Sequence, residues 1–436
     1  MTTLDIEPLR GAVITPEDAG WDAARTPWHL LADQRPALIV LARDATDVAE
    51  TVRFARSHGL RVAAQSTGHG ADALGPLNDA VLLRTVGMND VVVDPLERTA
   101  RVGAGARWSD VIAATAPHGL AGLHGFSAGV GVAGYVLGGG LGWLSRRYGL
   151  ASDHVRSFEV VTADGERRHV DCDREPDLYW ALRGGGGAGA IVTSIELELI
   201  ALQEAYAGAL LWPMARACEI AHAYREWVQT VPDTLTSSLR LMHFPPLPIL
   251  PDALRGRALV QLTMTYLGES RDGDALLAPL CALAPEIDHV GVLPAAALGE
   301  IAGDPVDPLP ARSHSRLLES LTADTIDRLV ALAGPAVTTL EVRHLGGALR
   351  QPENPGAAGA LSAEALVFAS GVPVTHEQDR ALHETFAALD GLGPAADRHT
   401  LLTFAGRADD ALPAATRNRL GQIRAAYDPD RLLGDR

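Results

Sequence analysis

The first half of the chain combines short apolar runs with amphipathic helix patterns. Residues 37–42 are apolar, and Asp44 can cap a following helix that places Val48, Val52 and Ala55 on one face before Gly59 ends it. Similar runs predict strands at 61–64, 80–83, 91–93, 100–102, 158–162 and 191–199, and a helix at about 108–116. The pattern predicts a mixed α+β half.

The pattern changes after about residue 203. Proline-marked segments at 245–251 and 304–310 lie between strands such as 258–266 and helices such as 323–333. The chain closes with a predicted helix at 415–427, ended by Asp428-Pro429. We therefore predict a domain boundary near residue 203.

Two glycine-rich segments stand out in the first half. Residues 125–142 read GFSAGVGVAGYVLGGGLG, and we expect neither a regular helix nor a regular strand there. Residues 183–189, RGGGGAG, come just before the predicted strand at 191–199. Such backbone is typical of close approach to a ligand, and two patches in one half favour one long cofactor.

Composition excludes several classes of function. The 436 residues carry a net charge of -17, which argues against nucleic acid as a partner. No lysine is present, which excludes Schiff-base enzymes, pyridoxal phosphate enzymes and the P-loop lysine. Cys172, Cys218 and Cys281 are isolated, and the histidines show no zinc-helix pattern, so we predict neither disulfides nor a metal site.

Location and source are predicted from the same composition. No apolar stretch is long enough for a membrane helix, and the start of the sequence lacks a signal-peptide pattern, so we expect a cytoplasmic protein without a membrane partner. The lack of lysine beside 44 glycines is typical of a GC-rich genome and is compatible with a bacterial source. The oligomeric state stays open.

Two familiar motifs overlap the first glycine-rich segment. Gly129, Gly131 and Gly134 have the spacing of a dinucleotide fingerprint, but that motif needs a strand before it and a helix after it. Gly125-Phe-Ser127-Ala-Gly129 has the spelling of a serine hydrolase elbow, which also needs a helix directly after the serine. The glycines that follow disfavour both, and a hydrolase built on Ser127 is kept as an alternative.

His69 lies in the small-residue turn Gln65-Ser-Thr-Gly-His-Gly70. Taken alone, such a histidine is best interpreted as a turn residue that bonds a backbone carbonyl. The two glycine-rich segments downstream favour another interpretation, in which the imidazole attaches covalently to a flavin whose diphosphate lies along backbone amides.

The motifs that follow one another along the chain resemble one known family. The runs RPALIVLARDATDVAETVRFARSHGLRVAAQSTGHG, GVGVAGYVLGGGLGWLSRRYGLASDHVRSFEVVTADGE, LYWALRGGGGAGAIVTSIELEL and AAYDPDRLL resemble flavin oxidases of the berberine bridge enzyme type, within the vanillyl-alcohol oxidase superfamily. The resemblance implies a PCMH-type FAD-binding domain at 1–203, a substrate-binding domain at 204–400 with an antiparallel sheet that roofs the flavin, and a segment at 401–436 that returns to the first domain.

The resemblance also implies the residues that bind the cofactor. His69 matches the histidine that bonds the flavin 8α-methyl group. The other matched positions are Ser66, Thr67, Gly68, Gly70, Ala71, Ser127, Gly129, Val130, Gly131, Gly134, Tyr135, Gly139, Gly140, Ile191 and Val192. Ser127 stands where doubly linked members have a cysteine, and a hydroxyl cannot replace that thiolate, so we predict FAD singly covalent through His69.

Two further departures bear on packing and on catalysis. Ala188 and Gly189 replace a usual Asn-Phe pair, which thins the packing near the cofactor. Leu401 and Thr403 stand where many members have the tyrosine and asparagine of a Tyr-x-Asn motif. That tyrosine often serves as the catalytic base, so the usual base is absent.

Candidate replacements lie in the second half. Residues 339–349 resemble the family's strand over the flavin, and strand alternation places Glu341 and Arg343 on one face and His344 on the other. Tyr266 and His243 are further candidates. An alcohol needs a base to take its proton, whereas a neutral amine can lose a hydride directly.

The sequence therefore predicts an FAD-dependent oxidase. It would remove a hydride from a C–H bond next to oxygen or nitrogen of a small molecule and pass the electrons to O2, giving H2O2. The resemblance suggests a bulky natural product of secondary metabolism as the substrate. The alternatives are the serine hydrolase and a flavin-binding protein without redox turnover.

Overall fold

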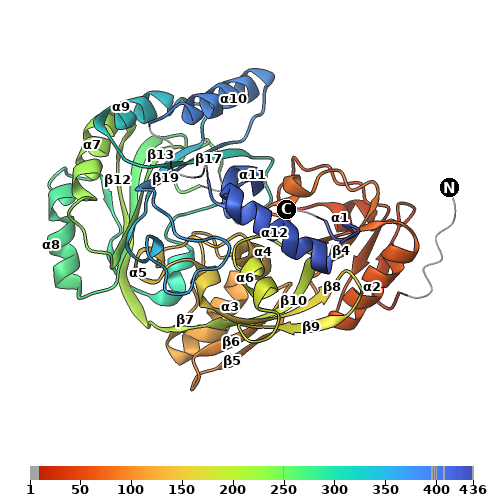
Figure 1. Ribbon diagram of the computed structural model, residues 1–436. Coiled ribbons are helices and arrows are strands. Elements are labelled where there is room, and N and C mark those ends of the chain that lie inside the picture. The colour runs from red at the N-terminus through yellow and green to blue at the C-terminus, as the bar shows by residue number, and fades with distance from the viewer. Residues whose placement is uncertain are drawn as a thin grey trace.

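The computed structural model describes residues 9–434 except 249, 394, 395, 397, 399, 406 and 407. Three main sheets organise the chain (Figure 1). Two of them, with their helices, occupy the right and lower parts of the figure, and the third lies on the left beneath a layer of helices.

The first sheet has the order β1-β2-β4-β3. Its strands are β1 (Ala12–Ile14), β2 (Leu38–Leu41), β3 (Arg61–Gln65) and β4 (Ala80–Arg84). Helix α1 is Trp21–Arg25, and helix α2 is Ala45–Ser57. The Asp44 carboxylate caps α2 by accepting from the backbone N–H groups of Thr46 at 2.7 Å and Asp47 at 3.0 Å, as the sequence predicted. The predicted apolar face of α2 is buried against the sheet.

The second sheet is antiparallel, with the order β5-β6-β10-β8-β9. Its strands are β5 (Val91–Asp94), β6 (Thr99–Gly103), β8 (Val155–Thr162), β9 (Arg167–Val170) and β10 (Ala190–Glu198). The associated helices are α3 (Trp108–Thr115), α4 (Val132–Leu137), α5 (Ser145–Tyr148) and α6 (Pro176–Leu182). A small ladder joins β7 (Leu120–Ala121) to β11 (Ile200–Ala201). The mixed helix and sheet content confirms the predicted α+β class.

The third sheet is antiparallel and takes its strands from residues 204–371. Its order is β15-β12-β14-β13-β18-β19-β17, with β16 paired to β12. The strands are β12 (Glu204–Pro213), β13 (Leu235–His243), β14 (Ala258–Tyr266), β15 (Ile287–Asp288), β16 (Gly291–Pro294), β17 (Arg312–Leu318), β18 (Thr339–His344) and β19 (Ala365–Gly371).

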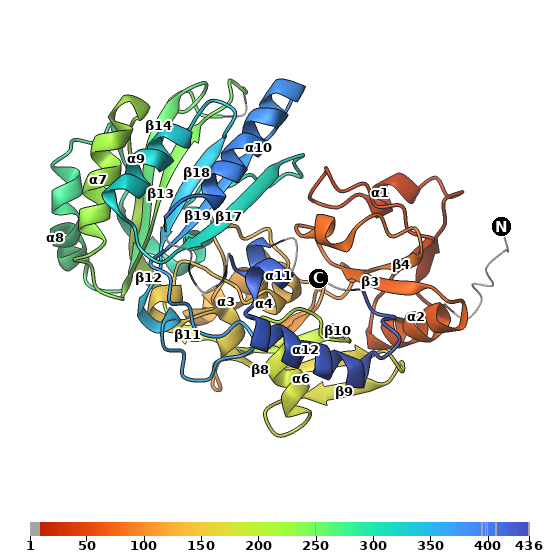
Figure 2. The ribbon, with the colours of Figure 1, turned by 45° about the horizontal axis from the view of Figure 1, so that its top comes forward.

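One face of the third sheet is covered by helices and the other faces the first half of the chain (Figure 2). The outer helices are α7 (Ala217–Trp227), α8 (Ser270–Cys281), α9 (Ala323–Leu332) and α10 (His376–Asp390). Alternate strand residues such as Leu239, Leu262 and Leu340 bury their side chains in a core shared with these helices. The intervening residues therefore point toward the first half. We call this inner face of the third sheet the roof.

The C-terminal segment crosses back to the first sheet after α11 (Ala408–Ala411) and α12 (Ala414–Tyr427). The Val62 N–H donates to the Leu432 carbonyl at 2.8 Å, and the Gly434 N–H donates to the Val62 carbonyl at 2.7 Å. The buried Asp428 carboxylate accepts from the N–H groups of Leu432 and Leu433. The last residues described thus extend the edge of the first sheet beside β3.

Two local predictions were wrong. The glycine-rich stretch at 125–142 contains the helix α4, because the run Val132–Leu137 holds a single glycine and lies between Gly131 and Gly138. The strand expected at 339–349 ends at His344, and residues 347–349 form a 3-10 helix after Gly346 at φ 106°. The helices in the described part of the chain are all too short or too polar to span a lipid bilayer.

Candidate cofactor site and its roof

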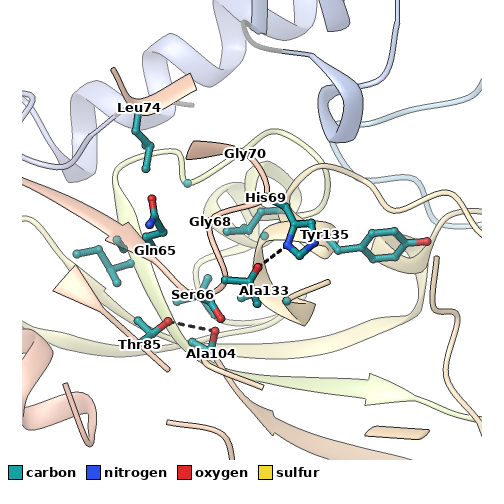
Figure 3. A pocket seen from close by; sticks show the side chains of 18 of the residues that line it. Gln65, Ser66, Gly68, His69, Gly70, Leu74, Thr85, Ala104, Ala133 and Tyr135 are labelled. Carbon is teal, nitrogen blue, oxygen red and sulfur yellow. Dashed lines mark hydrogen bonds between the residues drawn. The ribbon is translucent and has the colours of Figure 1, made fainter. Parts of the chain in front are cut away.

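A cavity of about 220 Å³ lies where the first sheet, the second sheet and the C-terminal segment meet. The turn after β3, the start of α4 and the start of β10 all contribute to its wall (Figure 3). Thr403, Leu433 and Gly434 contribute from the C-terminal part of the chain. The predicted cofactor residues that line it are Ser66, Thr67, Gly68, His69, Gly70, Ala71, Val130, Gly131, Gly134, Tyr135, Ile191 and Val192.

The His69 ring is held from two sides. Its Nδ1 atom is hydrogen-bonded to the Thr67 hydroxyl at 2.8 Å (Figure 3), and the Trp28 ring stacks on it with centroids 4.2 Å apart and planes 14° apart. The Trp28 N–H donates to the Thr67 carbonyl at 3.0 Å, so the segment that carries Trp28 runs beside the turn. The imidazole therefore has a defined orientation in the cavity.

Gly68 makes this turn possible. Its φ is +84°, and a Cβ there would lie 2.5 Å from the Pro27 Cβ. The wall at Gly131 is also close, because a Cβ there would lie 3.2 Å from the Ser66 hydroxyl oxygen, a tight contact. Glycine at position 68 is therefore required by both conformation and space, and glycine at position 131 avoids crowding Ser66.

Gln65 brings an unsatisfied polar group to the same cavity. Its side chain is buried, and neither atom of its amide has a hydrogen-bond partner among the described residues. A buried amide without partners is costly unless a ligand supplies them. The cavity is therefore suited to a polar ligand.

Four predicted cofactor residues do not line the cavity: Ser127, Gly129, Gly139 and Gly140. Gly139 and Gly140 have φ of 102° and 79°, and a Cβ on Gly140 would lie 2.5 Å from the Tyr135 ring. They let the chain pack against the wall of the cavity. Among the described residues, no hydrogen bond joins Ser127 to a histidine, so the hydrolase alternative lacks its base. The nearest strand before Ser127 is the two-residue β7, so the alternative also lacks the strand that leads into a nucleophile elbow.

The third sheet separates the four catalytic candidates into two pairs, one on each face. Glu341 and Arg343 lie on the inner face, whereas His344 lies on the helix-covered face, as strand alternation predicted. Tyr266 also lies on the helix-covered face, where it belongs to the core shared with the outer helices. His243 bonds the Ala333 carbonyl at 3.1 Å. Only Glu341 and Arg343 therefore face the half of the chain that holds the cavity.

Glu341 is the centre of a buried charged cluster. Its carboxylate lies 3.1 Å from the Arg240 guanidinium and 2.9 Å from that of Arg343, and it accepts a hydrogen bond from the Ser238 hydroxyl. Burial by itself would raise the pKa of Glu341, but Arg240 and Arg343 together lower it to about 2. Arg240 also pairs with Asp304 at 2.7 Å. Glu341 is therefore ionised at neutral pH.

Arg343 connects this cluster to the first half of the chain. Its guanidinium carbon lies 3.9 Å from the centre of the Phe126 ring and 5.0 Å from that of Phe404. Phe126 in turn stacks on Trp143, with centroids 3.7 Å apart. The glycine-rich segment that carries Phe126 thus meets the roof at Arg343.

His344 is in a different electrostatic environment. Burial, together with the nearby charges of Arg146 and Arg350, lowers its pKa to about 3. The imidazole is therefore neutral, but it lies on the face of the sheet that turns away from the cavity.

The positions of the missing Tyr-x-Asn motif have structural roles. Leu401 is buried in a small core with Leu141 and Leu150. The Thr403 N–H donates to the Gly138 carbonyl at 3.1 Å, and a Cβ on Gly138 would clash with Thr403. This segment closes the end of α4.

Several contributors to the site were not identified from the sequence: Trp28, Gln65, Phe126, Ser238, Arg240 and Phe404. Gln65 offered the clearest signal, because it is the first residue of the predicted turn at 65–70. The others come from distant parts of the chain, and no local pattern distinguishes them.

Comparisons with known proteins agree with this geometry. Residues 36–171 match the family model described as an FAD binding domain. An (R)-6-hydroxynicotine oxidase of Paenarthrobacter nicotinovorans is 36% identical over 205 residues, which are 47% of this chain and 45% of that protein. This chain spans about half the length of such curated relatives.

Solved structures resemble the chain over nearly its full length. The 6-hydroxy-D-nicotine oxidase of Arthrobacter nicotinovorans has a TM-score of 0.84 at 23% identity, covering 99% of this chain and 97% of its own. The glucooligosaccharide oxidase of Acremonium strictum, described with a 6-S-cysteinyl, 8α-N1-histidyl FAD, has a TM-score of 0.80 at 22% identity, covering 98% and 96%.

Proposed function

Because the chain carries an FAD-binding domain and the fold of the berberine bridge enzyme-like FAD-linked oxidases, as its motifs predicted, we propose that it is an FAD-dependent oxidase. It removes a hydride from a C–H bond next to nitrogen or oxygen of a small molecule. Bound FAD supplies the ring that accepts the hydride and passes the electrons to O2, giving H2O2. The observation that carries the proposal is the oriented His69 ring in a glycine-lined cavity.

The residues of the cavity fit FAD. Ser66 and Thr67 offer hydroxyl groups, and the backbone of residues 67–71 can approach a diphosphate closely because Gly68 and Gly70 carry no side chain. Gln65 offers a donor and an acceptor that lack partners among the described residues. Leu433 and Gly434 close the wall beside them.

The proposal includes one covalent bond to the cofactor. His69 is the attachment residue, since its ring lies in the cavity and is held in place by Thr67 and Trp28. Ser127 stands at the position of the second, cysteinyl bond of doubly linked members, and its hydroxyl cannot replace a thiolate. FAD is therefore linked through His69 alone.

The electrostatics of the roof favour an amine as the substrate. Glu341 is the only one of the three basic candidates Glu341, His344 and Tyr266 on the inner face, and its pKa of about 2 makes it a weak base. A neutral amine can lose a hydride without transferring a proton to the protein, whereas an alcohol cannot. Relatives named for a hydroxynicotine and for glucooligosaccharides support a bulky small molecule.

Replacing His69 tests the assignment of the cofactor. We expect His69→Ala to fold and to bind FAD reversibly, so that denaturation releases the flavin, whereas the unmodified protein keeps its yellow colour after precipitation. The measurement is in-gel flavin fluorescence together with the mass of the flavin-bearing peptide. Covalent flavin that persists in His69→Ala would contradict the assignment.

The rate of anaerobic flavin reduction tests the reaction. With an amine substrate, we expect the rate to rise with pH through the pKa of the substrate, and we expect Glu341→Gln to retain that profile. With an alcohol substrate, Glu341→Gln would instead lower the rate by about 100- to 10,000-fold while FAD stays attached. A flavin that no amine or alcohol bleaches would favour the inactive flavoprotein.

A further inference from the structure

A cysteine, a histidine and an aspartate, which are all potential metal ligands, lie close together on the outer helices that cover the third sheet. Cys218 and His222 lie on α7, and Asp327 lies on α9. Their ligand atoms are all within 4.8 Å of one another: His222 Nε2 is 2.8 Å from Asp327 Oδ1, and Cys218 Sγ is 3.8 Å from the same oxygen. Neither the cofactor cavity nor the roof involves them.

The two helices hold this cluster in place. Residues four apart on a helix share one face, so Cys218 and His222 project from adjacent turns of α7. Beneath them, Ile220 and Tyr224 of α7 and Ile326 of α9 belong to the same buried core. The backbone positions of the three ligands are therefore set by packing, while the side chains stay accessible from solvent.

We propose that Cys218, His222 and Asp327 form a site for Zn²⁺ or a closely similar transition-metal ion, with water at the fourth position. A tetrahedral zinc ion with sulfur, nitrogen and oxygen ligands places its ligand atoms about 3.5 Å apart. The distance between His222 Nε2 and Asp327 Oδ1 would have to lengthen from 2.8 Å, and the Cys218 sulfur, 3.8 Å from that oxygen and within 4.8 Å of the imidazole nitrogen, would have to move closer to both. Rotations of these accessible side chains that shift the ligand atoms by about 1 Å provide such changes.

The ligand set selects the class of metal. A thiolate and an imidazole favour Zn²⁺ over Mg²⁺ and Ca²⁺, which prefer oxygen ligands. Binding displaces the thiol proton of Cys218, because the thiolate is the ligand. The negative charge of Asp327 then compensates the remaining charge of the ion.

The position of the site indicates a structural role. The helices α7 and α9 cover the outer face of the third sheet (Figure 2). Glu341 projects from the inner face, and the cofactor cavity is lined by the first half of the chain and the C-terminal segment. A metal ion here would join α7 to α9 across about 100 residues of sequence, and a cross-link of this kind stabilises the folded state. The inference is independent of the proposed oxidase function.

Metal titration tests the proposal. Chelator-treated holoprotein is titrated with Zn²⁺ against a chromophoric chelator, and with Co²⁺ while thiolate-to-cobalt charge-transfer absorption is recorded as a difference spectrum. We expect one equivalent to bind, and we expect Cys218→Ser and His222→Gln each to weaken binding by at least about tenfold. Cys218→Ser also removes the charge-transfer band.

Cys281→Ser is the matched control, because Cys281 is likewise an exposed cysteine at the end of a helix in the same layer. It should bind both metals as the unmodified protein does, and zinc should raise the Tm of both but not of Cys218→Ser. Equal metal affinity in Cys218→Ser, His222→Gln and the unmodified protein would overturn the proposal. So would a charge-transfer band that Cys281→Ser abolishes. Asp327→Asn, whose side chain is 59% exposed, provides a third variant should either helix substitution impair folding.

Discussion

Glu341 carries its charge in one of the least accessible places in the protein, with an exposed fraction of 1%. A buried carboxylate is tolerated when opposite charges and hydrogen bonds compensate its lost hydration. Arg240, Arg343 and the Ser238 hydroxyl supply that compensation from two neighbouring strands. The same contacts that make Glu341 tolerable in the roof make it a poor proton acceptor.

The pKa of Glu341 predicts how stability depends on pH. Its folded pKa of about 2 lies below the usual value of 4.5, so its contribution is complete above pH 4.5 and is lost as pH falls from there toward 2. The contribution is on the order of 3 kcal/mol at neutral pH. Urea unfolding of the unmodified protein should therefore show stability falling as pH drops below about 4.5.

Glu341→Gln isolates this effect. Neutralising Glu341 leaves the buried Arg343 guanidinium without its carboxylate partner and leaves Arg240 with Asp304 alone. We therefore expect a loss of about 3–5 kcal/mol at pH 7 and a flatter dependence of stability on pH below 4.5. Glu319→Gln, which removes an exposed carboxylate beyond β17, serves as the control. An unchanged pH dependence in Glu341→Gln would show that other carboxylates govern the acid limb.

At the scale of single residues, the sequence predicted on which face of the strand a side chain lies but not which residues it contacts. Alternation along 339–344 correctly separated Glu341 and Arg343 from His344. It could not show that Arg240, about 100 residues earlier, lies opposite Glu341, because that contact depends on β13 pairing with β18. The low basicity of Glu341 therefore depends in part on that pairing and in part on Arg343 of its own strand.

At the scale of elements, the turn after β3 depends on a glycine whose role is steric. We expect Gly68→Ala to destabilise the protein by about 2–4 kcal/mol. The new methyl group would clash with Pro27, and alanine would also be strained in the left-handed backbone conformation of this position. The clash displaces His69, so less flavin should be covalently attached. Urea unfolding and in-gel flavin fluorescence measure the two effects.

Gly59→Ala is the matched control for the strain. Gly59 has a φ of +67° at the end of α2, but a Cβ there would contact nothing within 4 Å. Its cost should be about 1 kcal/mol with covalent flavin unchanged. If Gly59→Ala and Gly68→Ala were equally destabilising, the contact with Pro27 would not be the cause.

Elements with strong periodicity were predicted well and those in glycine-rich sequence were not. The strand 258–266 was predicted to the residue, and α2 and α12 were predicted to within one residue at each end. Helix α4 was missed because its stability comes from burial of Val132 and Val136 in the core beside the second sheet. Local helix propensity does not indicate such burial. The cavity was anticipated at residues 65–70, where the small-residue turn and the resemblance to flavin oxidases both indicated a cofactor.

At the scale of the whole molecule, one side chain of the first half holds the third sheet in position. Arg146 on α5 donates through Nε to the Leu345 carbonyl at 3.1 Å and through Nη1 to the Pro232 carbonyl at 3.0 Å and to the Leu235 carbonyl. Its Nη2 donates to the Asp233 carboxylate at 3.0 Å. A single guanidinium thus satisfies acceptors next to the start of β13 and the end of β18.

Arg146→Ala should therefore weaken the connection between the two halves. Three backbone carbonyls would lose a charged donor in a largely buried place, and we expect a loss of about 3–5 kcal/mol. Arg147→Ala removes the adjacent, exposed guanidinium, which lies over the Tyr148 ring at 5.7 Å, and should cost less than about 1 kcal/mol.

Urea unfolding of the two variants side by side gives the comparison, and limited proteolysis should reveal earlier cleavage near residues 232–235 in Arg146→Ala alone. Equal stability of both variants would mean that packing of the apolar contacts, and not Arg146, fixes the roof over the cofactor site.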